Sequence, residues 1–158
     1  MSSAIGLQYG STGVPITCTG ASLASAGARA STSVSNTSGF EDALVQFTCT
    51  SGATGTVATG YVQILAIASS DGGTTWPEGA NGTDGAVTLT VPTNAKVIGT
   101  LNVVANSILY KSDLFSVAYG FGGTLPSLWA IIIVNQSGHA LAATATVLQY
   151  IGVQHYVA

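Results

Sequence analysis

Hydrophobic and polar residues alternate along much of the chain with a period of two, as in β-strands that bury one face. The clearest case is the segment 45–50, where Val45, Phe47 and Cys49 are separated by polar residues. Segment 61–69 is more continuously apolar, which is typical of a strand covered on both faces. Segment 129–134 is the strongest β run in the chain, rich in β-branched residues and bounded by Pro126 and Gly138. The pattern therefore predicts strands at all three places.

Shorter apolar segments, bounded by Gly, Pro, Asn and Asp, predict further strands at 14–18, 87–91, 96–104, 107–111 and 143–157. The last of these is expected as one long strand or two short ones, kinked near Gly152. Segment 113–118 fits either a strand or one helical turn capped by Asp113. Seven to nine strands without an amphipathic helix predict an all-β, antiparallel two-sheet sandwich, and a jelly roll in particular.

The chain is long enough for one domain with a sizeable core. Residues 1–38 are rich in Ser, Thr, Gly and Ala, and we expect an N-terminal arm or weakly structured extension there. A weak strand around 28–34 is the alternative for part of this segment. Residues 39–158 are expected to form the sandwich, and its longest loop is 70–85, which Gly, Asn, Asp and Pro require to turn repeatedly.

Charge is scarce. Only 6% of the residues are charged, with three basic and six acidic side chains, whereas globular domains carry roughly 25%. A membrane helix needs about 18 or more apolar residues in a row, and no segment approaches that length. A membrane barrel needs aromatic girdles and more strands. We therefore expect neighbouring protein subunits to cover much of the surface, with the 71–84 loop facing water and the first forty residues and C-terminal strands covered.

The same composition argues against several partners and cofactors. Three scattered basic residues do not form the cluster that nucleic acid requires. The N-terminus lacks a basic region followed by an apolar run, so no secretory signal is expected. Cys18 and Cys49 have no metal-binding spacing, and in a reducing compartment we expect free thiols, with a disulfide as the alternative. No metal, cofactor or membrane partner is predicted.

No catalytic constellation is evident either. Asp71, Glu78 and Asp84 share one Gly-rich loop, where carboxylates ordinarily stabilise turns, although a calcium site is a second interpretation. No G-x-S-x-G motif occurs, and neither His139 nor His155 has an orienting carboxylate near it in sequence. The chain is therefore predicted not to be an enzyme.

Four residues are candidates for interaction with partners: Trp76, Trp129, His155 and Tyr156. Trp76 lies beside a proline in the polar loop, where an exposed indole could stack on a sugar or enter a neighbour's pocket. The equally weighted alternative is that Trp76 folds back as a lid on the sandwich. His155 alternates within the C-terminal strand and is either interfacial or simply exposed.

Several segments resemble small virion structural proteins of tailed bacteriophages. The segments are 69–79 (SSDGGTTWPEG), 87–94 (VTLTVPTN), 109–112 (LYKS), 115–118 (FSVA) and 121–126 (FGGTLP) ahead of Trp129. The resemblance spans roughly residues 55–155 and contains no catalytic motif. A jelly-roll chain of this size is similar to head-decoration (cement) proteins, which sit over joints between major capsid subunits.

The resemblance implies a virion location, with the major capsid protein and further copies of the chain, as homodimer or homotrimer, as partners. It also makes the first 38 residues a candidate arm that grips the capsid. Two alternatives remain open: a tail, head-fibre or receptor-binding module that contacts host carbohydrate, and a stand-alone carbohydrate-binding or hydrolytic sandwich domain.

Overall fold

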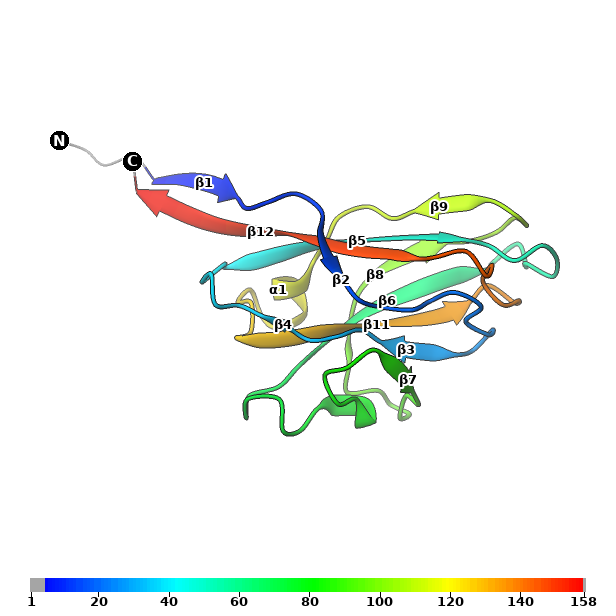
Figure 1. Cartoon of the computed structure of the whole chain (residues 1–158), viewed down its shortest axis with the longest axis horizontal. Coiled ribbons are helices and arrows are strands. Elements are labelled where there is room, and N and C mark those ends of the chain that lie inside the picture. The colour runs from blue at the N-terminus through cyan, green and yellow to red at the C-terminus, as the bar shows by residue number, and fades with distance from the viewer. Residues whose placement is uncertain (1–4, 158) are drawn as a thin grey trace.

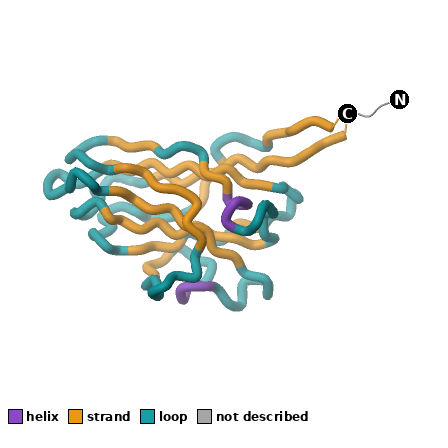
Figure 2. The backbone as a smooth tube through the Cα atoms, turned by 180° about the vertical axis from the view of Figure 1, so that it is seen from behind, coloured by secondary structure: helices purple, strands orange, loops and turns teal. Residues whose placement is uncertain are grey.

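The computed structural model describes residues 5–157, which form two antiparallel sheets packed face to face (Figures 1 and 2). The first sheet has the order β1-β12-β5-β10, with β2 also on β12 and β9 also on β5. The second has the order β7-β3-β11-β6-β8, with β4 also on β11. The bounds are β1 Ile5–Tyr9, β2 Val14–Ile16, β3 Ala28–Ala30, β4 Val34–Ser35, β5 Asp42–Thr50, β6 Tyr61–Ala68, β7 Gly85–Val87, β8 Lys96–Asn102, β9 Leu109–Lys111, β10 Phe115–Ser116, β11 Leu128–Gln136 and β12 Val147–Val157, with a 3₁₀ turn η1 at Pro77–Gly79 and a short helix α1 at Val117–Gly120.

The strand pairs are nested along the chain. β2 pairs with β12, β3 with β11, β5 with β9 and β10, and β6 with β8. This is the pairing of one long antiparallel ribbon, and the ribbon is rolled up so that β5 also meets β12 and β6 also meets β11. Nested pairs closed in this way define a jelly roll, so the predicted all-β sandwich is confirmed.

The inner core lies between the two sheets and follows the period-two pattern. Along β5 buried and half-buried residues alternate strictly, with Val45, Phe47 and Cys49 fully buried. Trp129, Ile131 and other inward residues of β11 face them across the sandwich. The strand predicted at 45–50 is therefore confirmed, and it begins three residues earlier.

A second, outer core explains why β6 and β11 read as continuously apolar. Their other face carries buried residues including Leu65, Ile67 and Ile132. Residues 70–95, which we call the flap, fold over this face, and Trp76 and Leu89 pack against it. The 71–84 loop was expected to face water, and half of its residues are exposed, while Glu78 is buried and Trp76 packs on the outer core.

The arm expected over residues 1–38 is largely replaced by strands of the sandwich. β2 is an edge strand on β12 despite Pro15, while β3 and β4 pair with β11. The small side chains of β3 gave a weak signal, but Ala28 and Ala30 are buried beneath the flap. Sheet pairing with distant strands, rather than local propensity, orders this segment.

A shorter part of the N-terminal segment, β1, does project from the sandwich. Whereas β5 pairs with β12 only as far as its first residue, Asp42, opposite Val153, β1 pairs with β12 from Val153 to Val157. Together they form a two-stranded ribbon that projects from one end of the sandwich (Figures 1 and 2). β12 runs through Gly152 as a single strand. The Phe40 ring packs there so closely that a Cβ would lie 2.4 Å from it.

Two local predictions need adjustment. Segment 113–118 contains both alternatives, the strand β10 followed by helix α1, but the cap is Ser116, whose hydroxyl accepts from the Tyr119 N–H, and not Asp113. In the segment 87–91, strand pairing stops at Val87, although Leu89 still points toward the outer core.

Candidate interaction surfaces

Most of the few charged side chains are engaged within the protein. Lys96, Lys111 and Asp113 are exposed and have no side-chain polar partner among residues 5–157. The other charged side chains each bond to a neighbouring group: Arg29, Glu41, Asp42, Asp71, Glu78 and Asp84. The surface thus offers even less free charge than the composition suggests.

Glu78 fastens the far end of the flap. The residue is only 7% exposed. Its carboxylate accepts from the backbone N–H groups of Thr90 at 2.5 Å and Asn94 at 2.6 Å, and from the hydroxyls of Thr90 and Thr93. Burial raises its pKa, but these hydrogen bonds outweigh it and lower the pKa to about 2. Its φ of 59° lies in the left-handed region, an uncommon backbone that the carboxylate contacts hold in place.

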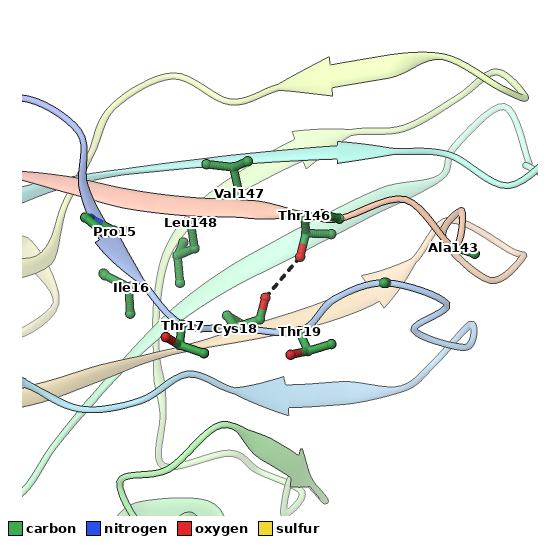
Figure 3. Close-up of a pocket in the computed structure, with 11 residues that line it drawn as sticks. Pro15, Ile16, Thr17, Cys18, Thr19, Ala143, Thr146, Val147 and Leu148 are labelled. Atoms are coloured by element: carbon green, nitrogen blue, oxygen red, sulfur yellow. Dashed lines mark hydrogen bonds between the residues drawn. The ribbon is translucent and has the colours of Figure 1, made fainter.

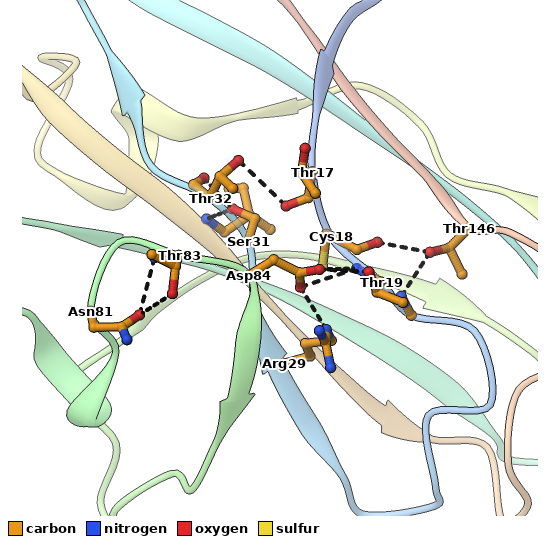
Figure 4. A network of polar contacts seen from close by, with 12 residues as sticks. Thr17, Cys18, Thr19, Arg29, Ser31, Thr32, Asn81, Thr83, Asp84 and Thr146 are labelled. Carbon is orange, nitrogen blue, oxygen red and sulfur yellow. Dashed lines mark hydrogen bonds and ion pairs between the residues drawn. The ribbon is translucent and has the colours of Figure 1, made fainter.

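Asp84 ties the flap to the N-terminal segment (Figure 4). It forms an ion pair with Arg29 at 2.6 Å and accepts from the N–H and hydroxyl of Thr19. Burial raises the pKa of Asp84, but the hydrogen bonds from Arg29 and Thr19 lower it by more, so the net shift is downward. The same loop of chain is held on its other side by Thr146, whose hydroxyl donates to the Cys18 carbonyl.

Asp71 stabilises the turn that opens the flap. It accepts from the hydroxyls of Ser69 and Thr75 and from the Thr75 N–H. The Thr75 hydroxyl is the main reason that the pKa of Asp71 lies well below its usual range. Of the three loop carboxylates, Asp71 stabilises a local turn, as the turn interpretation predicted, whereas Glu78 and Asp84 bond to other segments of the chain. Within residues 5–157 no three potential metal ligands gather.

The two tryptophans do not offer the surfaces that the sequence suggested. Trp129 is 1% exposed and packs edge-on against Tyr150, with ring centroids 5.4 Å apart. Its assignment as an interaction residue is wrong, because a strand buried on both faces holds it in the inner core. Trp76 is half-buried on the outer core and donates from Nε1 to the Gly73 carbonyl at 3.1 Å, which is the lid arrangement.

His155 and Tyr156 lie on the projecting ribbon. His155 Nδ1 is 2.5 Å from the Glu41 carboxylate, a partner 114 residues away that the sequence order concealed. No Ser or Cys side chain in the described part of the chain bonds to this histidine. Tyr156 is 46% exposed, and its ring lies over Gly6 on the opposite strand. Both residues therefore remain available to a partner.

Several exposed apolar side chains lie along the two edges of the β5–β12 sheet. On the ribbon, Ile5, Leu7 and Tyr9 are 73%, 49% and 56% exposed. Near β9, at the other edge, Ile108 and Leu109 are also exposed. Apolar patches of this kind mark interaction sites on proteins. β1 was not predicted from the sequence, although the Ile5-x-Leu7-x-Tyr9 alternation was a usable signal.

A shallow groove of about 560 Å³ runs between the segment that follows β2 and the start of β12 (Figure 3). Its lining is small and mostly apolar, with Ile16, Leu148 and alanines beside Thr146. Cys18 at its floor and Cys49 in the inner core are free thiols, and burial raises the pKa of each to about 12. The groove thus brings no charged or reactive group to a ligand.

Comparisons with known proteins add little to this description. No protein-family model matches the chain, and no curated protein matches it. A solved structure with some similarity is the crystal structure of the Yersinia pseudotuberculosis-derived mitogen. It shares 12% identity over 97% of this chain and 88% of the mitogen, with a TM-score of 0.25. Within residues 5–157, no helix has the length and apolar character needed to cross a bilayer.

Proposed function

We propose that this chain is a non-enzymatic virion structural protein, a decoration (cement) protein that binds across major capsid subunits and stabilises a phage head. The observation that carries the proposal is the state of the surface. Charged groups are few and mostly engaged internally, while apolar side chains remain exposed along both edges of one sheet. Such a surface fits a protein that functions packed against other proteins.

The mechanism we infer is multivalent. Each copy makes modest apolar and backbone contacts, and many copies on one shell add these contacts into a strong restraint against internal pressure. A rigid jelly roll with its loops held by Glu78, Asp84 and Asp71 suits this role, because little conformational entropy is lost when it docks.

The alternative, a tail or fibre module that binds host carbohydrate through Trp76, gains less support. A sugar platform requires an exposed aromatic face, whereas Trp76 packs on the outer core.

The test is to compare virions with and without this protein. Particles that lack it are expected to release their DNA at a lower temperature, followed with a DNA-binding dye, and added purified protein is expected to restore the release temperature. Unchanged DNA release together with reduced attachment to host cells would overturn the cement role in favour of the receptor-binding alternative.

A further inference from the structure

The edges of the two sheets are not equally protected against pairing with another strand. Exposed edges are normally blocked by charge, proline or short length. β9 contains Lys111 and is followed by Asp113, β8 begins at Lys96, and β2 contains Pro15. β7 is three residues long and follows Asp84, while β4 and β10 have two residues each. β1 has five residues without charge or proline, so it is an unprotected edge of the described chain.

The backbone of β1 is oriented to accept another strand. The Gly10 N–H donates to the Gly152 carbonyl at 2.8 Å, and Gly10 follows directly on the register that pairs Tyr9 with Val153. Because hydrogen-bonding groups alternate in direction along an antiparallel pair, Gly6 and Gln8 also bond to β12. The backbone groups of Ile5, Leu7 and Tyr9 therefore point to the open side.

We propose that β1 pairs with β1 of a second copy of this chain, antiparallel and with the two-fold axis at Leu7. In this register Leu7 lies opposite Leu7 of the second copy, and Ile5 lies opposite Tyr9 of the second copy. Each of these pairs exchanges the backbone hydrogen bonds that are open in the single chain. The pairing joins two β5–β12 sheets into one continuous sheet, and it does not depend on the proposed virion role.

The chemistry of the edge favours an identical strand as occupant. An antiparallel two-fold contact requires a self-complementary sequence, and Ile5-x-Leu7-x-Tyr9 places apolar residues opposite apolar residues throughout. An aromatic residue opposite a β-branched one is a favourable cross-strand pair. The ionisable groups at the ribbon, His155 and Glu41, are paired with each other, so nothing at this edge selects a charged partner.

The shape of the molecule permits this contact. The ribbon projects from the end of the sandwich (Figures 1 and 2), so two copies joined through β1 keep their bodies apart. A two-stranded ribbon is by itself only marginally stable in water. A second pair of strands gives this ribbon the neighbours it lacks, with the exposed Ile5, Leu7 and Tyr9 side chains lying along one face of the enlarged sheet.

Disulfide trapping tests the pairing and its register. In the proposed dimer the two Leu7 Cα atoms lie about 5.5 Å apart, within the range of roughly 4.4–6.8 Å that a disulfide spans. Leu7→Cys is expected to give a covalent dimer on a non-reducing gel after mild oxidation. The native Cys18 and Cys49 are buried and do not compete. Leu109→Cys, an exposed position on the other edge of the same sheet, is the matched control and is expected to remain monomeric.

A second measurement does not depend on oxidation. Sedimentation velocity of the unmodified chain, up to about 1 mM, is expected to show a concentration-dependent dimer. Leu7→Lys places two like charges opposite each other and is expected to weaken the dimer at least about tenfold, whereas Leu109→Lys leaves it intact. A monomer at every concentration, equal cross-linking of both cysteine variants, or loss of the dimer only in Leu109→Lys would each overturn the proposal.

Discussion

The buried carboxylate of Glu78 gives the most direct test of how the flap is held. Replacing Glu78 with Gln keeps the side-chain volume but turns one oxygen into an amide donor. That amide then faces either the Thr90 or the Asn94 N–H, both of which need an acceptor. The substitution therefore removes a partner without opening a cavity.

The expected loss follows from these contacts. One backbone N–H left without an acceptor costs about 1–3 kcal/mol, and the remaining bonds change from charge-assisted to neutral, at about 1 kcal/mol more. We expect Glu78→Gln to destabilise the closed flap by about 3 kcal/mol, which corresponds to about a hundredfold more frequent opening.

Hydrogen exchange of peptides that cover residues 88–95 measures this opening, because the Thr90 and Asn94 amides are themselves the affected donors. Asp113→Asn is the matched control, since Asp113 is exposed and its side chain has no polar partner in the described chain. Exchange in 88–95 that equals the wild type in a folded Glu78→Gln variant would refute the reasoning.

The same carboxylate gives the flap a pH dependence. Because the pKa of Glu78 falls from its ordinary value of 4.5 to about 2 on folding, its contribution is fully present above pH 4.5 and is lost as pH falls toward 2. The stability difference between wild type and Glu78→Gln is therefore expected to be constant above pH 5 or so and to shrink below it. A difference that does not change with pH would contradict this assignment.

Other contacts give further expectations. Asp84→Asn should lower the free energy of unfolding by about 1 kcal/mol in urea titrations at pH 7, because the ion pair with Arg29 is mostly buried, with side chains 14% and 26% exposed; no change would make the pair dispensable. Trp129→Ala should cost about 3–5 kcal/mol in the same titration as a large core truncation, and a near-neutral result would contradict its burial. Cys18 and Cys49 should react with a thiol reagent at pH 8 only after unfolding, since burial raises the pKa of each to about 12; rapid labelling of the native chain would show that they are accessible.

The parts of the fold that sequence could predict are those with a strong local period. The Val45, Phe47 and Cys49 alternation located β5, and the β-branched segment 129–134 located β11. No local pattern predicted the pairing of β3 and β4 with β11. Ala28 and Ala30 have little strand propensity of their own, and they are ordered by a strand about a hundred residues away.

The candidate residues divide along the same line. For Trp76 the sequence left two roles open, an exposed aromatic platform or a lid on the sandwich. The packing of Trp76 on the outer core beneath the flap shows that it is a lid. Trp129 was assigned to an interface because the sequence could not show that both faces of β11 are covered. The His155–Glu41 pair was hidden because its members meet only when β12 pairs beside β5, more than a hundred residues away in sequence.

The central claim is that this surface functions packed on other proteins, as a repeated component of a viral shell. The copy number of the chain relative to the major capsid protein in purified virions, from gel densitometry, tests it most directly. On the order of hundreds of copies per particle are expected, as multivalent clamping of a shell requires. A handful of copies confined to a tail or fibre, or none, would contradict it.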